Sequence, residues 1–397
     1  LKRNIKNAFW REMVEKREDV VGIDAAILMA PKVWEASGHV GAFSDPLVEC
    51  KACHHRFRAD SLEKKQCPDC GGVLTEPKQF NLLVEAQLGV VEGAKQKVYL
   101  RGEITQGVHV NFKNVLDSTR LKIPFGIAQV GKTFRNEITP GNFTFRSREF
   151  EQMELQYYIQ PNTSGAAAWF KYWKEKRMQW YLNLGLDKKK LRFREHATDE
   201  KAHYAKAAWD IEYLAPFEGW KELEGIHHRG DWDLRRHQEF SGKDFSYADD
   251  KTGNKYLPWI IETSGGVDRA ALFFLIDAYV EEKVGDEQRV VLRLNHKLAP
   301  YKIAIFPLLA NKKPLVDLAK KIYIDLKENF MVAWDDRGNI GKRYRSQDEI
   351  GTPFCVTVDF DSLEQKDITV RDRDTMKQER VKIKDLEFYI NEKFSEN

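Results

Sequence analysis

The sequence lacks any apolar run that approaches the roughly 20 residues of a membrane-spanning helix, so we expect no membrane span and no membrane partner. It also lacks an excess of either charge, because 64 Lys and Arg residues nearly balance 61 Asp and Glu residues. The net charge of +3 neither requires nor excludes a polyanionic partner, and a nucleic-acid surface would have to be a local patch. Internal repeats and low-complexity tracts are absent as well.

Cysteine is scarce, and no signal peptide opens the chain. Four of the five cysteines lie between positions 50 and 70, which favours a metal site in a reducing compartment over a disulfide framework. The first residues, Leu1-Lys2-Arg3-Asn4, lead straight into an amphipathic pattern. We therefore expect a cytoplasmic protein whose natural N-terminal segment is missing from this sequence.

The length and hydrophobic content predict two or three folding units, because 397 residues with 42% hydrophobic content are too many for one simple core. In the first part of the chain, hydrophobic periodicity predicts helices over 4–17, 166–184 and 267–280, and strands over 98–100, 126–134 and 148–159. The tryptophans of the second helix are expected to serve packing.

Two further regions differ from the first part of the chain in composition and in the order of their predicted elements. The polar residues 195–256 are predicted to form irregular loops in which His227, His228 and His237 are solvated. From about residue 298, strands alternate with helices, which indicates a separate α/β domain. The predicted strands are 301–309, 331–335 and 354–360, and the predicted helices are 315–329 and 383–394.

The spacing of the clustered cysteines is the most specific signal. Cys50 and Cys53 form one CxxC pair, and Cys67 and Cys70 form a second after thirteen intervening residues. Two such pairs can close a tetrahedral zinc site that leaves no open coordination position, so zinc here would be structural. The alternative is that the four thiols are free or paired by chance. The basic neighbours of the cluster could contact RNA or simply be solvated.

A second signal is a charged hairpin. The strand that ends at Phe134-Arg135-Asn136-Glu137 is followed by Phe145-Arg146-Ser147-Arg148-Glu149-Phe150, which enters the strand over 148–159. In that strand Phe150, Gln152, Glu154 and Gln156 alternate with apolar residues and share one face. Converging guanidinium groups beside aromatic rings suit a nucleoside triphosphate, although such a hairpin can also be an ordinary charged surface.

The third signal is the run from Glu262 to Arg269, in which Gly265 and Gly266 lead into the apolar helix over 267–280. Paired glycines let a ligand approach the backbone, and an arginine in the first helical turn lies where anions bind. Alone, this segment could equally be a helix start with a solvated arginine.

Together these segments resemble the class II aminoacyl-tRNA synthetases, and most closely the homodimeric glycyl-tRNA synthetases. Residues 1–46 are similar to motif one, the dimer-forming element, residues 126–159 to motif two and residues 262–280 to motif three. Stretches typical of the glycyl family occur at 37–39, 111–116, 202–206, 222–226, 338–342 and 370–374, so the resemblance covers nearly the whole chain.

The resemblance implies an α+β fold, with an antiparallel sheet flanked by helices over 1–298. A zinc ribbon would be inserted at about 48–75, and an α/β anticodon-binding domain would cover 299–397. Such an enzyme activates glycine with ATP and magnesium to form glycyl-adenylate. It then transfers the glycyl group to the 3′ end of tRNA-Gly.

The resemblance also assigns roles to residues. Arg135 would hold the α-phosphate and the carboxylate of glycine, Arg269 the γ-phosphate, and Glu222 magnesium. The ATP site would comprise Arg135, Asn136, Glu137, Phe145, Arg146, Ser147, Arg148, Glu149, Phe150, Glu222, Leu223, Gly266, Val267, Asp268 and Arg269. The glycine site would comprise Arg58, Glu103, Phe150, Glu151, Gln152, Met153, Glu154, Glu262, Thr263, Ser264, Gly265 and Gly266. Of these, Glu103, Glu154, Glu262 and Ser264 would surround the ammonium group.

A physical argument agrees with glycine as the substrate. Every competing amino acid is larger, so a filled pocket rejects it by steric clash and needs no editing domain, and none is evident. Two alternatives remain. One is a class II synthetase for another amino acid such as threonine or proline, and the other is a related RNA-binding protein that has lost catalysis. The acidic residues oppose the first, and the retained Arg135 and Arg269 oppose the second.

Overall fold

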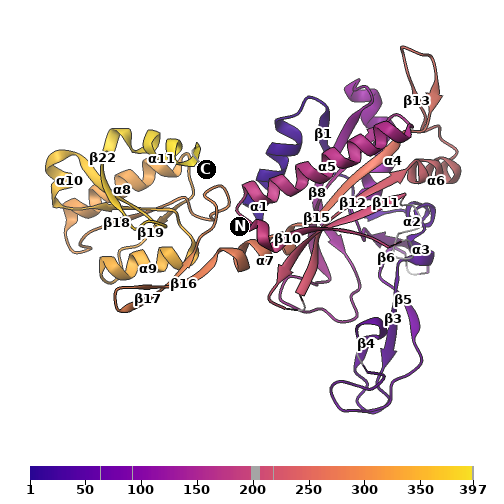
Figure 1. The fold of residues 1–397 in the computed structure, drawn as a ribbon, viewed down its shortest axis with the longest axis horizontal. Coiled ribbons are helices and arrows are strands. Elements are labelled where there is room, and N and C mark those ends of the chain that lie inside the picture. The colour runs from indigo at the N-terminus through magenta and orange to yellow at the C-terminus, as the bar shows by residue number, and fades with distance from the viewer. Residues whose placement is uncertain (63, 92, 198–205, 218, 396–397) are drawn as a thin grey trace. The chain divides into compact units, whose positions relative to one another are not determined.

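The computed structural model describes residues 1–62, 64–91, 93–197, 206–217 and 219–395, so most of the stretch 202–206 lies outside the described residues (Figure 1). The chain forms two compact units. One unit comprises Phe9–Gln179 and Lys189–Leu272, and the other comprises Leu1–Ala8, Trp180–Lys188 and Phe273–Asn397. The division in the last third of the chain therefore falls inside the helix α7 (Val267–Ala278), ahead of the boundary expected at 298/299.

A seven-stranded sheet organises the first unit, which confirms the predicted antiparallel core. Only the edge pair β1–β8 is parallel, and every other neighbouring pair is antiparallel. In spatial order the strands are β1 (Val20–Ile23), β8 (Phe125–Phe134), β9 (Glu149–Ile159), β15 (Trp259–Gly266), β12 (Gly219–Gly230), β11 (Ala207–Ala215) and β10 (Leu191–Glu195).

Helices cover the two faces of this sheet differently. On one face, α4 (Thr105–Thr119) packs Phe112 against Phe125 and Tyr158, and α6 (Trp232–Ser241) adds Leu234 to the same cluster. On the other face, α5 (Thr163–Asn183) packs Trp173 against Tyr157, with the ring centroids 5.1 Å apart. The packing role predicted for Trp173 is thus confirmed, and the polar face of β9 lies on the α4 side.

The N-terminal region adds short elements before and around the segment that carries the four clustered cysteines. The helix α1 (Lys2–Trp10) continues into one π-helical turn (Arg11–Glu15), close to the helix predicted over 4–17. Two three-stranded sheets follow, β2-β7-β6 and β4-β3-β5. Their elements are β2 (Leu28–Met29), α2 (Pro31–Ala36), α3 (His39–Ala42), β3 (Ser44–Glu49), β4 (Arg56–Arg58), β5 (Lys78–Asn81), β6 (Val84–Leu88) and β7 (Gln96–Leu100).

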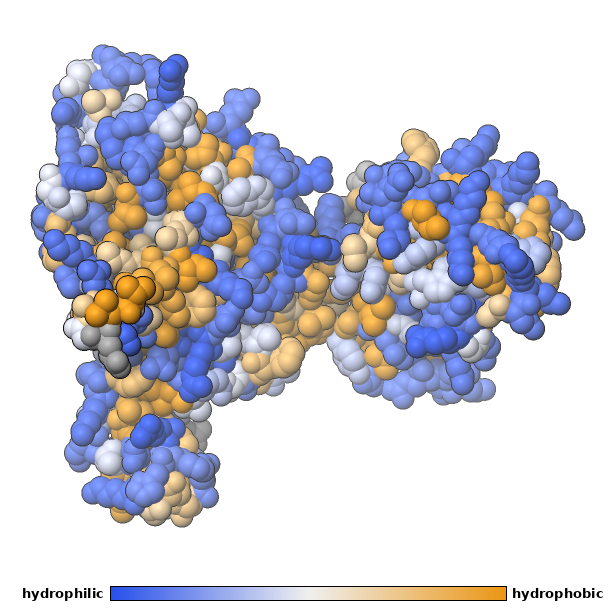
Figure 2. All heavy atoms as spheres, turned by 180° about the vertical axis from the view of Figure 1, so that it is seen from behind, coloured by the Kyte–Doolittle hydropathy of each residue, from blue (hydrophilic) through white to orange (hydrophobic). Residues whose placement is uncertain are grey.

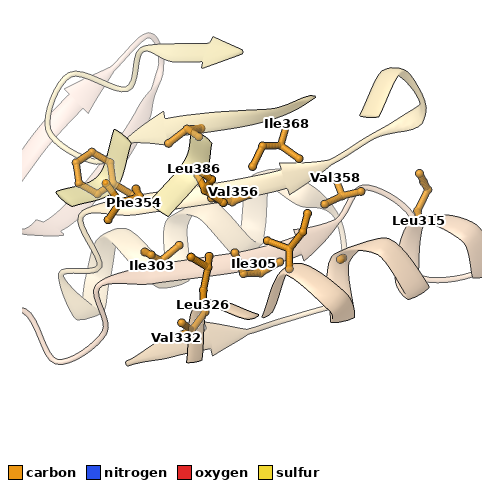
Figure 3. Close-up of a cluster of buried hydrophobic side chains, with 14 residues drawn as sticks. Ile303, Ile305, Leu315, Leu326, Val332, Phe354, Val356, Val358, Ile368 and Leu386 are labelled. Atoms are coloured by element: carbon orange, nitrogen blue, oxygen red, sulfur yellow. The ribbon is translucent and has the colours of Figure 1, made fainter. Parts of the chain in front are cut away.

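The second unit contains a five-stranded sheet of order β19-β18-β20-β21-β22, which confirms the α/β texture expected after residue 298. Its buried core joins Ile303 and Ile305 of β18 to Val356 of β20 and to Leu315 and Leu326 of α8 (Figure 3). Its elements are β18 (Ile303–Pro307), α8 (Lys313–Lys327), β19 (Val332–Trp334), α9 (Ile340–Ile350), β20 (Phe354–Val358), α10 (Phe360–Gln365), β21 (Asp367–Asp372), β22 (Gln378–Lys382) and α11 (Leu386–Ser395), and the hairpin β16 (Tyr279–Val284) and β17 (Glu287–Leu292) precedes them.

The prediction of irregular loops over 195–256 is wrong, because β11, β12 and α6 lie in that region. His228 and His237 are buried, and His227 is only half-exposed on β12. Charged residues of β12 and α6 pair with one another inside the protein, as Arg229 does with Asp233. Their composition is therefore as polar as that of a solvated loop, although they are buried. In the described part of the chain, no helix is both long and apolar enough to cross a membrane.

Candidate active site

A pocket of about 90 Å³ opens on the α4 side of the seven-stranded sheet, in the first unit. Its walls come from the end of β8, the loop and strand of the charged hairpin, the start of β12 and the junction of β15 with α7. The lining residues are Arg135, Glu137, Thr144, Phe145, Arg146, Ser147, Phe150, Gln152, Glu222, Leu223, Ser264, Gly266, Asp268 and Arg269. The two sequence signals other than the cysteines, the charged hairpin and the run from Glu262 to Arg269, thus meet at this pocket together with the start of β12.

Asp268 fastens the two motifs together. Its carboxylate accepts a hydrogen bond of 2.7 Å from the backbone N–H of Glu151, and its carbonyl accepts one of 3.3 Å from the Thr144 hydroxyl. The first helical turn of α7 is therefore held against β9 and against the hairpin loop. Thr144 was not predicted as a site residue, and nothing in the sequence pattern distinguishes it.

Two arginines in this pocket are each held against an aromatic ring. The guanidinium carbon of Arg135 lies 5.3 Å from the centroid of Phe150, and Arg135 Nε donates to the carbonyl of Gly102 at 3.1 Å. The guanidinium carbon of Arg269 lies 4.5 Å from the centroid of Phe145. Stacking of this kind orients the planar guanidinium fork while leaving N–H donors for an anion.

A β-bulge brings two consecutive residues of β12 to the pocket. On β11, Ile211 pairs with Glu224 while the next residue pairs with Glu222, so Leu223 is the extra residue. Both Glu222 and Leu223 consequently line the pocket, which strict alternation would prevent. Burial alone would raise the pKa of Glu222, but the charge and hydrogen bond of Arg269, 3.1 Å away, lower it.

Behind the pocket wall lies a buried group of acidic side chains. Ser264 lines the pocket, and its hydroxyl donates to Glu154 at 2.6 Å. Residue pairing between strands places Ser264 opposite Glu154 and Glu262 opposite Gln156. The Gln156 amide donates to Glu262 at 2.9 Å. The alternation predicted for residues 148–159 therefore places Glu154 and Gln156 on the pocket side of the sheet.

Glu262 is embedded in a charge network. Both of its oxygens accept hydrogen bonds of 3.0 Å from Arg229, and Nδ1 of His227 lies 2.8 Å from one of them. Arg229 also forms two bonds of 2.8 Å to the buried Asp233 of α6. Burial alone would raise the pKa of Glu262, but Arg229 and His227 hold it well below its usual range.

Glu103, just before α4, has its own partner. Its Oε2 atom lies 3.3 Å from Nε2 of His39, and its Oε1 atom accepts a hydrogen bond of 2.9 Å from the Gln106 amide. Against the effect of burial, His39 and then Arg229 lower the pKa of Glu103 to about 2. The network residues His39, Gln106, Arg229 and Asp233 were not predicted as site residues. The stretch 37–39, which is typical of the glycyl family and contains His39, is the signal that could have indicated this network.

Several sequence-predicted site residues lie away from the pocket wall. Met153 and Thr263 are buried and alternate with pocket-facing residues, as Gly265 does, so they belong to the opposite sheet face. Glu149 forms an ion pair with Lys132 on the surface. Asn136, Arg148, Glu151 and Val267 contribute backbone or packing around the pocket, and Arg58 of β4 pairs with Asp45 and Asp60.

The four clustered cysteines converge as their spacing predicts. All four sulfur atoms lie within 4.8 Å of one another, with Cys50 to Cys70 at 3.5 Å and Cys53 to Cys67 at 3.6 Å. Zinc–sulfur bonds of about 2.3 Å in a tetrahedron place sulfurs about 3.8 Å apart, so the donor set fits zinc. A Cβ at Gly72 would lie 2.8 Å from the sulfur of Cys50, which explains the glycine there.

Comparisons with known protein families divide the chain into two matched regions. Residues 90–279 match the tRNA synthetase class II core domain (G, H, P, S and T), and residues 302–393 match the anticodon binding domain. These regions contain, respectively, the pocket and the five-stranded sheet of the second unit.

Similar curated proteins span nearly the whole chain. The glycine–tRNA ligase of Alkaliphilus oremlandii is 51% identical over 423 aligned residues, covering 99% of this chain and 90% of that protein. The glycine–tRNA ligase of Borreliella burgdorferi is 53% identical, with 98% and 88% covered. Among solved structures, prolyl-tRNA synthetase from Cryptosporidium parvum, complexed with L-proline and AMP, aligns with a TM-score of 0.63. At 16% identity it covers 99% of this chain and 71% of that one, and supports the fold.

Proposed function

Since the chain belongs to the glycine–tRNA ligases, a family of class II aminoacyl-tRNA synthetases, we propose that its pocket activates glycine with ATP. A carboxylate oxygen of glycine attacks the α-phosphorus, pyrophosphate leaves, and glycyl-adenylate forms. The 3′-terminal hydroxyl of tRNA-Gly then takes the glycyl group and AMP is released. Positioning and electrostatic stabilisation supply most of the catalysis in such a displacement.

The observation that carries this proposal is the continuity between the arginine-lined pocket and the acidic group behind Ser264. Arg135 lines the pocket and donates to the carbonyl of Gly102, the residue before Glu103, and we assign to it the α-phosphate and the carboxylate of glycine. Arg269 takes the γ-phosphate, and the adenine ring stacks on Phe150. A zwitterionic amino acid then has its carboxylate toward Arg135 and its ammonium toward the acids.

The acids also favour glycine over larger amino acids. With the ammonium of glycine among Glu103, Glu154 and Glu262, a side chain on the α-carbon would have to displace these residues, and each is tied to its neighbours by hydrogen bonds. Moving any of them would break contacts of a buried charged group, which costs several kcal/mol. Threonine and proline are therefore excluded by the same residues that attract the ammonium.

Magnesium fits the carboxylate of Glu222, which remains ionised because Arg269 lowers its pKa and which is exposed to the pocket. Hard oxygen ligands from one or two carboxylates and from substrate phosphates are what magnesium requires. When bound, it would neutralise phosphate charge during the displacement. Glu222 would hold it, and Arg269 would orient Glu222.

Zinc would occupy the cluster of Cys50, Cys53, Cys67 and Cys70 as a structural ion. Four thiolates leave no position for substrate or water, so the metal would hold the ribbon together and take no part in the reaction. Free thiolate ligands and a tRNA substrate both suit the reducing cytoplasm, where we place the protein.

A homodimer is the proposed assembly. Side chains of Ile27, Leu28, Leu88, Val90 and Val91, in and around the small sheet β2-β7-β6, are apolar and exposed. Figure 2 shows that one face of the molecule carries apolar patches among hydrophilic side chains. Sedimentation equilibrium that gave only the 46.3 kDa mass would refute the dimer.

Charging of tRNA with labelled glycine tests the function. We expect acid-precipitable glycine to accumulate with tRNA-Gly and with no other tRNA. Arg269→Ala should abolish it, because both the stack on Phe145 and the contact with Glu222 disappear. Lys189→Ala, on the exposed surface of the first unit and outside the pocket lining, is the control. Transfer of threonine or proline at a rate equal to that of glycine would overturn the proposal.

A further inference from the structure

The three buried carboxyl groups behind the pocket differ in one respect, which is whether a basic side chain contacts them. Glu262 has Arg229 and His227 within 3.0 Å, and Glu103 has His39 at 3.3 Å. Glu154 contacts two hydroxyl groups and one amide. Within the described part of the chain, no Lys, Arg or His nitrogen lies within 4.0 Å of the Glu154 carboxylate, although its side chain is only 1% exposed.

The hydrogen bonds around Thr105 add an independent constraint. Its hydroxyl oxygen lies 2.6 Å from Oε2 of Glu154 and 3.1 Å from Oε1 of Glu262. A threonine hydroxyl has a single hydrogen and can donate to only one of these oxygens. If both carboxyls were ionised, one contact would bring two lone pairs together. A proton on Glu154 satisfies both contacts, since Glu154 donates to Thr105 and Thr105 donates to Glu262.

We infer that Glu154 carries a proton while the pocket is empty and that the ammonium group of glycine displaces it. The inference rests on the proposed glycine site. In the exchange, the O–H bond of Glu154 breaks, its proton passes to solvent and the carboxylate forms an ion pair with the incoming ammonium beside Ser264. The substrate thus supplies the cation that this carboxyl group lacks, and one proton is released for each glycine bound.

The environment of Glu154 raises the pKa of its carboxyl group, as a proton on Glu154 requires. Burial, followed by the charges of Glu262 and Glu103, raises the pKa of Glu154 to about 8. The groups facing it are Glu262 on β15, His227 and Arg229 on β12, and Arg101 and Glu103 ahead of α4. The cations among them are engaged by the other two acids or, for Arg101, by backbone carbonyls.

Calorimetric titration of the intact enzyme with glycine tests the inference. Titrations in phosphate and in Tris at the same pH separate the heat of buffer protonation from that of binding. We expect close to one proton released per bound glycine at pH 6 to 7, about half a proton near pH 8 and fewer above it. Because the proton competes with the ammonium, the affinity for glycine should rise about tenfold per pH unit below pH 7 and level off near pH 8.

Two variants sharpen the test. Glu154→Gln cannot exchange a proton, so its remaining glycine binding should be weak and independent of pH over this range. Glu103→Gln removes one of the charges that favour the proton, so proton release should be half-maximal at a lower pH than in the wild type. Glu195→Gln, at the exposed end of β10 in the same sheet, is the matched control and should release as many protons as the wild type.

The outcomes separate this inference from the proposed function. Glycine binding without buffer-dependent heat would show that Glu154 is ionised beforehand, which overturns the inference and leaves the glycine site intact. Proton release that persists in Glu154→Gln would assign the proton to another group. An absence of glycine binding would refute the proposed function together with the inference.

Discussion

The Nε2 atom of His39 lies 3.3 Å from the Oε2 atom of Glu103, while Nδ1 of the same ring lies 2.8 Å from the Ser37 hydroxyl. That hydroxyl donates its hydrogen to the carbonyl of Trp34 at 3.2 Å, so it accepts from the ring. The ring is therefore fixed at both nitrogens, by Ser37 on one side and by Glu103 on the other. His39 thus holds the carboxylate of Glu103 in place.

His39→Gln should raise the KM for glycine about tenfold or more, because a hydrogen bond to a charged group such as the Glu103 carboxylate contributes about 1.5–3 kcal/mol. The KM for ATP should stay unchanged, since His39 contacts neither Arg269 nor Glu222. His54→Gln, at an exposed histidine beside Glu49 in the segment of the clustered cysteines, is the control. Steady-state pyrophosphate exchange measures both constants, and an equal rise in the two would indicate a purely structural role for His39.

A buried ion pair joins α5 to the bulged strand β12. Arg177 and Glu224 are both at most 1% exposed, and the Nη2–Oε2 distance is 2.8 Å. Glu224→Gln leaves a buried guanidinium without its counter-ion and should lower the free energy of unfolding by about 3–5 kcal/mol. Urea denaturation followed by tryptophan fluorescence measures the loss. Glu175→Gln, in an exposed pair on the same helix, should change it by less than about 1 kcal/mol. Similar losses in both variants would refute the assignment.

Metal analysis tests the cysteine cluster. The wild type should contain one zinc per chain, and Cys53→Ser or Cys67→Ser should lose most of it, because three thiolates bind zinc far more weakly than four. Cys355→Ala should retain the metal, since Cys355 is buried in β20 of the second unit. Plasma mass spectrometry of dialysed protein provides the measurement. A wild-type content well below one zinc per chain would contradict the structural site.

A groove of about 700 Å³ in the second unit is the candidate surface for the tRNA anticodon. Lys342 and Arg345 of α9 line it together with Tyr344. Lys342→Ala should raise the KM for tRNA-Gly severalfold. It should also reduce the slope of log affinity against log salt concentration by about one, because one phosphate contact is lost. Glycine-dependent pyrophosphate exchange should be unaffected. Lys320→Ala, at an exposed lysine on α8, should alter neither the KM for tRNA-Gly nor the exchange. A loss of exchange in Lys342→Ala would contradict the assignment of tRNA binding to the second unit and of adenylate formation to the first.

The sequence predicts those parts of the fold whose periodicity and neighbours agree. The strand over residues 148–159 alternates clearly, and its observed bounds, Glu149–Ile159, differ by one residue. The strands and helices around Ile303 and Leu315 are likewise predicted, because a single apolar core selects their inward faces. The cysteine spacing alone is enough to predict the convergence of four sulfurs.

The region 195–256 shows why other parts could not be predicted. On β12, the charged residues Glu224 and Arg229 are buried, because Arg177 of α5 pairs with the first and Asp233 of α6 pairs with the second. A sequence prediction that treats polar residues as exposed cannot identify these partners. The extra residue at Leu223 is equally invisible, since a β-bulge depends on the register with β11. The proton balance at Glu154 follows from three-dimensional contacts only.

Amino-acid-dependent exchange of labelled pyrophosphate into ATP tests the central claim most directly. The assay reports adenylate formation without tRNA, so it isolates the pocket formed by Arg135, Phe150 and Arg269 and the acids behind Ser264. Tested with each of the twenty amino acids, the enzyme should give rapid exchange with glycine and only background with the rest. Exchange that is faster with any other amino acid, or no exchange with glycine, would contradict the account.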